Sequence, residues 1–148
     1  EAIRLSIETM RNNTGGPFGA VVVRDGKIIA RGYNKVVSTN DPTAHGEIVA
    51  IRHATVSVGD FNLSGCQLYT SAQPCPMCLG AIYWARIERI YYGNSVQDTA
   101  AIGFDDEVIY QQLARPPRER HVPEVPLLST EARRVFDEYL AKLDRARY

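Results

Sequence analysis

FGAVVVRDGKIIARGY, residues 18–33, is the stretch that decides the fold. The runs Phe18–Arg24 and Lys27–Tyr33 are rich in the β-branched residues that favour strands. Asp25-Gly26 lies between them, and this dipeptide is the strongest short signal for a hairpin turn. The sequence therefore predicts an antiparallel hairpin at one edge of a sheet.

Helices and strands are expected to alternate along the rest of the chain. Apolar spacing and capping signals predict helices over about 1–13, 44–58, 75–86, 105–114 and 129–148, and strands over 66–70, 89–92 and 125–128. Residues 34–43 and 93–104 are expected to be loops, and residues 115–126, with four prolines, an irregular connection. Strands joined by helical crossovers pair in parallel, and helices then cover both faces of the sheet. We therefore expect an α/β fold, a three-layer α/β/α sandwich around a mixed sheet of about five strands.

Composition limits the possible functions. The 148 residues suit one domain, and 17 basic residues balance 17 acidic ones. A neutral chain lacks the broad positive field of most nucleic-acid-binding proteins, so we expect no nucleic-acid partner. We also expect no membrane partner, because no apolar run approaches the roughly 18 residues of a membrane span. Three cysteines do not build a disulfide framework, which favours a reducing, cytoplasmic compartment.

Two short motifs carry the chemistry: His45-Gly46-Glu47, and Pro74-Cys75-Pro76-Met77-Cys78. A histidine alone is more often structural, and a Cys-x-x-Cys alone is compatible with redox chemistry or structural zinc. Together, each at the expected start of a helix, they match the H-x-E…P-C-x-x-C signature of zinc deaminases. Both motifs should lie near one end of the sheet.

The donors of these motifs suit one zinc ion (Zn2+) per subunit, held by His45, Cys75 and Cys78. The remaining histidines and cysteine are poor fourth ligands, because Cys66 is expected in the core and His53 lies about two helical turns beyond His45. His121 is expected in a charged, proline-rich segment. Three protein ligands leave one position for water, which is typical of catalytic zinc.

Glu47 is the predicted proton shuttle of a hydrolytic deamination, in which water replaces an amino group on a ring carbon and ammonia leaves. The alternative is that Glu47 only caps its helix, through the backbone of Thr43 or Ala44. No organic cofactor is expected, because Gly15-Gly16 follows a helix and is interpreted as a turn.

These motifs resemble the cytidine/deoxycytidylate deaminase superfamily. Longer strings resemble its bacterial guanine deaminase branch: GGPFGA (15–20), NDPTAH (40–45), CLGAIYWAR (78–86), GFDD (103–106) and the terminal Tyr148. The resemblance implies a cytidine deaminase-like fold over one domain, 1–148, a small nucleobase substrate, and conversion of guanine to xanthine and ammonia. It also implies a homodimer, with residues 116–148 closing the active site of the same chain or, by exchange, of its partner.

The resemblance also implies roles for side chains outside the zinc motifs. Asp106 would read the polar edge of the base and assist proton transfer, Asn34 would bind the base, and Tyr148 would close over it. Ala44, Phe18, Trp84 and Phe104 would complete the pocket. Each has a plainer interpretation: core packing for the aromatic rings, a helix cap for Asp106, a turn for Asn34 and disorder for Tyr148.

Two departures from the branch bear on the substrate. Gly46 stands where the branch commonly has alanine, and Ala72-Gln73 replaces the more usual Cys-Glu. Neither changes a zinc ligand, but both leave guanosine and cytosine open as substrates, with tRNA adenosine less favoured. A noncatalytic zinc module and a thiol redox protein are the alternatives from other classes.

Overall fold

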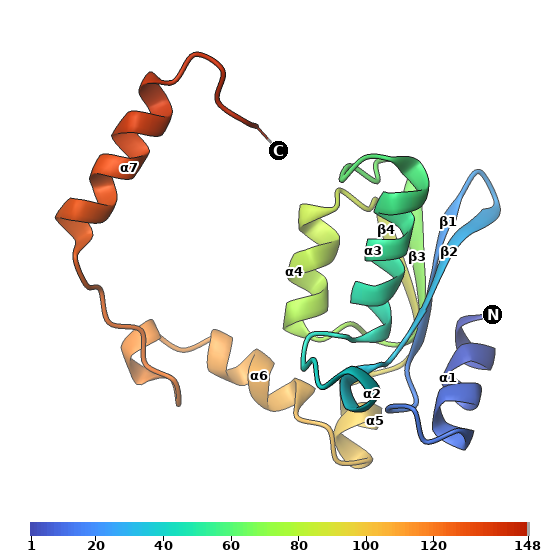
Figure 1. Ribbon diagram of the computed structural model, residues 1–148. Helices are drawn as coiled ribbons and strands as arrows, with labels where there is room; N and C mark the ends of the chain where they lie inside the picture. Colours follow the sequence, from blue (N-terminus) through green and yellow to red (C-terminus); the bar gives the residue numbers. More distant parts are fainter. Residues whose placement is uncertain (148) are drawn as a thin grey trace. The chain divides into compact units, whose positions relative to one another are not determined.

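The computed structural model describes residues 1–147 and confirms an α/β fold with a mixed sheet between helices (Figure 1). The chain divides into two compact units, Glu1–Tyr110 and Gln111–Tyr148, each described by itself. The elements that belong to the first unit or begin in it are α1 (Ala2–Arg11), β1 (Gly19–Arg24), β2 (Lys27–Tyr33), α2 (Val36–Thr39), α3 (Gly46–Val58), β3 (Cys66–Ala72), α4 (Pro76–Trp84), β4 (Arg89–Asn94), α5 (Val96–Ala101) and α6 (Asp106–Leu113).

The predicted hairpin is confirmed. Asp25 and Gly26 both have positive φ, 51° and 74°, as a type I′ turn requires. The pairing of β1 with β2 is antiparallel and shifts register once, between Val22 and Val23. The twist of this turn matches that of the flanking strands, so β1 and β2 remain paired up to Arg24 and Lys27.

The sheet has four strands in the order β2-β1-β3-β4. β1 runs antiparallel to both β2 and β3, and β3 runs parallel to β4 across the α4 crossover. The predicted fifth strand, Val125–Leu128, is wrong, because these residues are not a strand. Pro126 has no N–H to donate to a ladder, and Leu128 is left-handed with φ 53°.

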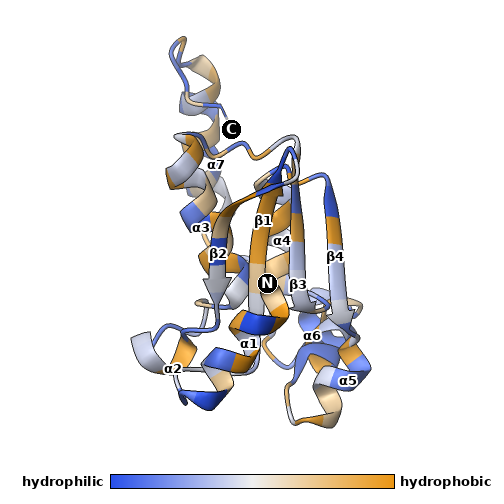
Figure 2. Ribbon diagram, turned by 90° about the vertical axis from the view of Figure 1, so that its right-hand side faces the viewer, coloured by the Kyte–Doolittle hydropathy of each residue, from blue (hydrophilic) through white to orange (hydrophobic). Residues whose placement is uncertain are grey.

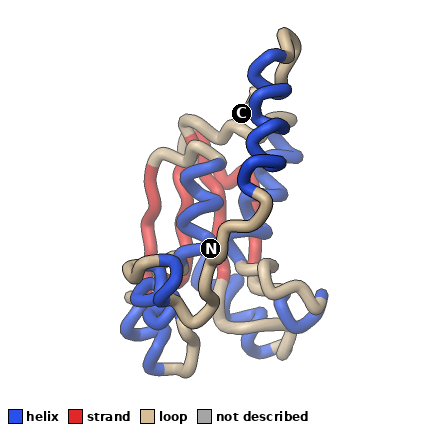
Figure 3. The backbone as a smooth tube through the Cα atoms, turned by 90° about the vertical axis from the view of Figure 1, so that its left-hand side faces the viewer, coloured by secondary structure: helices blue, strands red, loops and turns tan. Residues whose placement is uncertain are grey.

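One face of the sheet is covered by α3 and α4, as Figures 1 and 3 show. The main hydrophobic core lies between these layers. Gly32 of β2 allows the closest approach, because a Cβ there would lie 2.2 Å from the carbonyl oxygen of Gly46 in α3. The buried members of this core are Ala20, Val22, Ala30, Ala50, Ala54, Leu63, Cys66, Leu68, Ile82 and Ala85.

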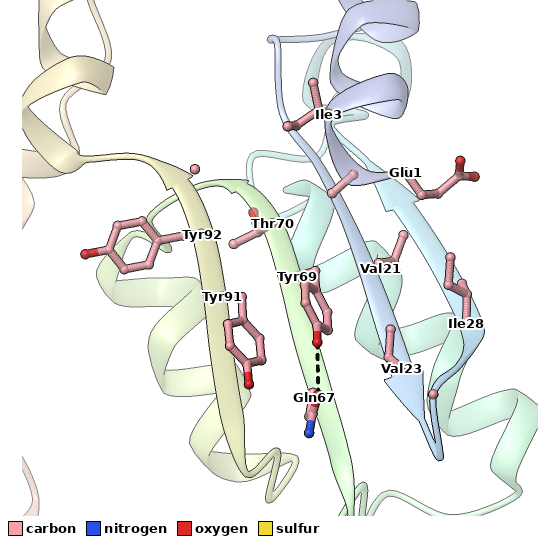
Figure 4. Close-up of a pocket in the computed structure, with 13 residues that line it drawn as sticks. Glu1, Ile3, Val21, Val23, Ile28, Gln67, Tyr69, Thr70, Tyr91 and Tyr92 are labelled. Atoms are coloured by element: carbon pink, nitrogen blue, oxygen red, sulfur yellow. Dashed lines mark hydrogen bonds between the residues drawn. The ribbon is translucent and has the colours of Figure 1, made fainter.

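The opposite face is covered by α1, which packs on β1, β2 and β3 (Figure 2). Beside α1, a hollow of about 530 Å³ exposes part of the sheet (Figure 4). The rings of Tyr69 and Tyr91 stack there with their centroids 4.6 Å apart. This apolar face is on the side of the sheet away from α3 and α4.

Two expected loops contain short helices. α2 lies within 34–43, and α5 lies within 93–104. The α5 helix begins with a capping box, in which the Ser95 hydroxyl accepts a hydrogen bond from the Asp98 N–H and the Asp98 carboxylate accepts one from the Ser95 N–H. A serine followed three residues later by an acid was the sequence signal for this helix.

The second unit contains the short 3₁₀ helix η1 (Pro117–Glu119) and the helix α7 (Ser129–Ala141). An ion pair joins Arg120 to Glu124. In α7, Val135, Phe136 and Leu140 are all more than 60% exposed, so residues 111–147 leave these three apolar side chains largely uncovered. Across residues 1–147, no helix combines the length and apolar character that a bilayer crossing requires.

Candidate active site

The zinc motifs lie at the starts of two packed helices. His45 is the N-cap of α3 and Cys75 is the N-cap of α4, and both have extended backbone angles. Pro76 occupies the first position of α4, where its missing N–H leaves no helical bond unmade. Because α3 and α4 contact each other, the two starts are brought together. The exposed N–H groups there favour negatively charged ligands such as thiolates.

His45, Cys75 and Cys78 form a cluster whose ligand atoms all lie within 4.8 Å of one another. The Nδ1 atom of His45 lies 3.6 Å from each of the two sulfur atoms. A tetrahedral zinc ion with ordinary bond lengths would separate a nitrogen and a sulfur ligand by about 3.6 Å. The three residues therefore fit zinc in both donor type and spacing.

The two thiols are not equivalent. Hydrogen bonding from Cys78 and the nearby His45 imidazole lower the pKa of Cys75 to about 4, against the effect of burial. The pKa of Cys78 is raised, because it donates to Cys75 and is buried. Cys75 therefore loses its proton readily, and its negative charge then disfavours loss of the proton from Cys78. A bound divalent cation would stabilise both thiolates, so this pair of cysteines is as expected of a metal site.

No fourth protein ligand joins this cluster among the described residues. The Nδ1 atom of His53 lies 2.8 Å from the backbone oxygen of Arg31. Cys66 is fully buried in the hydrophobic core. The arrangement therefore matches the open, three-ligand kind of zinc site.

Glu47 lies in the first turn of α3, only 6% exposed. Burial raises the pKa of its carboxyl group. Its Oε2 atom lies 3.6 Å from the sulfur of Cys78, so the carboxyl group borders the cluster. The capping alternative is not met, because the N–H groups of Thr43 and Ala44 both donate to Asp41.

A pocket of about 320 Å³ opens over this cluster. It brings together most of the residues that the sequence pointed to, from both ends of the first unit. These are Phe18, Asn34, His45, Glu47, Cys75, Phe104 and Asp106. The pocket is at the lower end of the 300–1,000 Å³ that small-molecule sites usually have, roughly what a single base requires.

The Asn34 amide is held in one orientation. Its Oδ1 atom accepts hydrogen bonds from the N–H groups of Gly16 and Val36, at 3.3 and 3.2 Å. Gly15 packs so closely here that a Cβ would lie 2.2 Å from the Asn34 carbonyl oxygen. With Oδ1 used by the loop, the amide NH2 is the group that Asn34 can offer to a ligand.

Two aromatic rings and a carboxyl group complete the pocket wall. Phe18 and Phe104 meet edge to face, with centroids 4.8 Å apart. Asp106 begins α6 and is half-buried. Burial raises the pKa of Asp106, and the nearby charge of Cys75 raises it further. The pocket thus combines an apolar wall with polar groups that can bind the edge of a ring.

Two predicted pocket residues, Trp84 and Ala44, are not among the residues that line it. Trp84 ends α4, far from its first turn, is 63% exposed and lies near the guanidinium of Arg86. Ala44 is buried, and its backbone N–H and carbonyl oxygen are paired with Asp41 and Lys35. Tyr148 lies outside the described residues. The structure therefore places Trp84 and Ala44 outside the lining of this pocket, and Tyr148 stays a prediction.

Other residues contact the site without having been predicted. Val36, Val37, Pro42, Ala72 and Gln73 line the pocket. Val36 and Val37 sit in α2, the helix that was mistaken for loop, so their short apolar run was the available signal.

A half-buried imidazole, two buried thiols and a buried carboxyl group, brought together at the starts of two helices, define a zinc-dependent hydrolytic deaminase. The family model for the cytidine and deoxycytidylate deaminase zinc-binding region matches residues 1–94, and the chain belongs to this family.

Individual relatives carry two different names. The chain is 50% identical to the guanine deaminase of Bacillus subtilis over 130 residues, 88% of this chain and 83% of that protein. The X-ray structure of guanine deaminase from Bacillus subtilis superposes with a TM-score of 0.95 at 46% identity, covering 99% of this chain and 94% of that one. A tRNA-specific adenosine deaminase from Agrobacterium fabrum is 42% identical over 109 residues, 74% of this chain and 68% of that protein.

Proposed function

We propose that this protein hydrolyses guanine to xanthine and ammonia. The observation that supports the proposal is one pocket lined by the zinc ligands His45 and Cys75 together with Glu47, Asn34 and Asp106, above a metal cluster that Cys78 completes. The relative of 50% identity is a guanine deaminase, which favours guanine over guanosine and cytosine.

The base would bind between the apolar wall of Phe18 and Phe104 and the polar groups opposite. The Asn34 NH2 donates to an acceptor on the purine, such as the carbonyl oxygen of guanine. Asp106 accepts from ring N–H or amino donors when it is ionised. These two groups together match a ring that carries both acceptors and donors.

The chemical step then depends on Glu47. His45, Cys75 and Cys78 would hold the zinc ion, which would supply Lewis-acid activation of water there. The Glu47 carboxyl group takes one proton from this water and delivers it to the ring nitrogen, and it then carries the remaining hydroxyl proton to the departing amino group. The water oxygen bonds to the ring carbon, the carbon–nitrogen bond breaks, and ammonia leaves. Burial of Glu47 keeps bulk water away from these transfers.

The deciding experiment measures ammonia released from guanine, guanosine, cytosine, ammeline and a tRNA substrate by zinc-loaded protein. We expect the highest kcat/KM with guanine, and loss of activity in Glu47→Gln with one zinc ion retained. A higher kcat/KM with another of these compounds would make that compound the substrate in place of guanine. A Glu47→Gln variant of unchanged rate would contradict the role of the acid.

We further propose a cytoplasmic homodimer in which residues 116–148 close an active site. The three free, buried cysteines support a reducing compartment. The exposed Val135, Phe136 and Leu140 of α7 support association of this segment with another surface. Size-exclusion chromatography with light scattering measures the molecular mass. The Phe136→Asp substitution should shift this mass toward that of the monomer. A monomer at all concentrations would contradict the dimer.

A further inference from the structure

Thr70 contacts the acid from a different part of the fold. It lies in β3, whereas Glu47 lies in α3, and its hydroxyl donates a hydrogen bond to Glu47 Oε1 across 3.2 Å. Both residues are buried, each with 6% of its surface exposed. This bond therefore links the centre of the sheet to the first turn of the helix that carries the acid.

We propose that Thr70 is a positioning residue, which holds the Glu47 carboxyl group in the orientation that proton transfer requires. With Oε1 bound to Thr70, Oε2 is the oxygen left beside the metal ligands, 3.6 Å from the sulfur of Cys78. The inference rests on the proposed function, since it assigns Thr70 a part in the reaction of that site.

The surroundings of Thr70 make it a rigid donor. Its strand is paired on both sides, with Ala20 of β1 and Tyr92 of β4 as the neighbouring residues. A threonine side chain is branched at Cβ, which restricts its rotamers. A buried carboxyl oxygen without a hydrogen-bond partner is disfavoured, so Glu47 Oε1 gains from keeping the bond to Thr70.

A role in packing alone predicts the opposite pattern of variants. Thr70→Val keeps the shape and removes the hydroxyl, whereas Thr70→Ser keeps the hydroxyl and removes the methyl group. If Thr70 only fills space, the serine variant is the more damaged of the two. If it positions Glu47, the valine variant loses the function and the serine variant restores it.

The kinetic test compares the two variants with the parent protein on guanine, after zinc content is shown to be one ion per chain. We expect Thr70→Val to lower kcat by about ten- to a hundredfold with little change in KM. Thr70→Ser should stay within about threefold of the parent rate. Thr9→Val is the matched control, since it removes another buried threonine hydroxyl, one that donates to Leu5 in α1, and should leave kcat unchanged.

A second readout does not depend on the substrate. Crystal structures of the zinc-loaded proteins should show one Glu47 rotamer in the parent and in Thr70→Ser, and a displaced or divided carboxyl group in Thr70→Val. An unmoved Glu47 in Thr70→Val, or a serine variant slower than the valine variant, would overturn the proposal. If the parent does not deaminate guanine but Glu47 moves in Thr70→Val, the proposed substrate fails and the positioning inference stands.

Discussion

The hydroxyl of Tyr110 donates a hydrogen bond of 2.8 Å to the backbone carbonyl oxygen of Pro74. Pro74 immediately precedes the ligand Cys75, and Tyr110 lies one turn after Asp106 on α6. This bond therefore anchors the helix that carries Asp106 to the loop that carries the metal ligands. We therefore expect this bond to help set the spacing between Asp106 and the zinc cluster.

Removal of this anchor should affect substrate binding more than metal binding. In Tyr110→Phe we expect KM for guanine to rise about fivefold, which corresponds to one neutral hydrogen bond of about 1 kcal/mol. Zinc content should stay at one ion per chain, because no ligand is altered. Steady-state kinetics and metal analysis on the same sample check this, and loss of zinc with unchanged KM would contradict it.

Asn34 provides a test of which group the protein offers to the base. In Asn34→Asp the carboxylate can still accept from Gly16 and Val36, but an acceptor replaces the NH2 donor. We expect the variant to fold, and kcat/KM for guanine to fall about ten- to a hundredfold or more. Thermal unfolding and kinetics measure the two effects.

The control is Asn34→Ala, which removes both the donor and the loop acceptor. It should lose stability as well as activity, because the partly buried N–H groups of Gly16 and Val36 lose their partner. A fully active Asn34→Asp would show that the NH2 group does not bind the substrate.

Metal removal should destabilise the fold, because His45 and Cys75 join the starts of two helices. A metal present at a thousandfold its dissociation constant stabilises the folded state by roughly 4 kcal/mol. We expect chelation to lower the unfolding temperature, added zinc to restore it, and His45→Ala to abolish the response. His53→Ala changes a histidine of the same helix outside the cluster and should retain one zinc ion.

The hairpin and the metal ligands were predictable because their signals are local and chemical. Asp25-Gly26 specifies a hairpin turn because both residues readily adopt positive φ. Cys75 and Cys78 at a helix start indicate a metal such as zinc because sulfur is one of its preferred ligand atoms. The order of helices and strands in the first unit then followed from periodicity. The short helices α2 and α5 were missed, and the sheet size was overestimated because the apolar residues of 125–128 were interpreted without enough regard for Pro126.

Tertiary neighbours were not predictable in the same way. Thr70 is an ordinary strand residue in the sequence, and its contact with Glu47 depends on how α3 packs against the sheet. Trp84 was placed in the pocket by resemblance, yet it lies at the far end of the helix that Cys75 caps. The kind of metal could thus be predicted from short sequence motifs. The contact between Thr70 and Glu47 became visible only in the folded chain.

Gly32 should be required for the position of the whole helix α3. A Cβ at this residue would lie 2.2 Å from the carbonyl oxygen of Gly46 and 2.3 Å from the nitrogen of Ala50, both backbone atoms. Gly32→Ala must therefore push α3 away from β2, at a cost of about 1–3 kcal/mol in the free energy of unfolding. Because Gly46 is adjacent to the metal ligand His45, a displaced α3 would also move His45, so the affinity for zinc should fall together with the stability.

Gly80 supplies the matched control for that substitution. It lies within α4, and a Cβ there would meet nothing within 4 Å. Gly80→Ala should therefore stabilise the protein by about 0.5–1 kcal/mol, because alanine loses less backbone entropy in a helix. Denaturant unfolding and zinc titration measure both variants. Equal effects from the two substitutions would show that the contact between Gly32 and α3 does not set the position of the metal ligand.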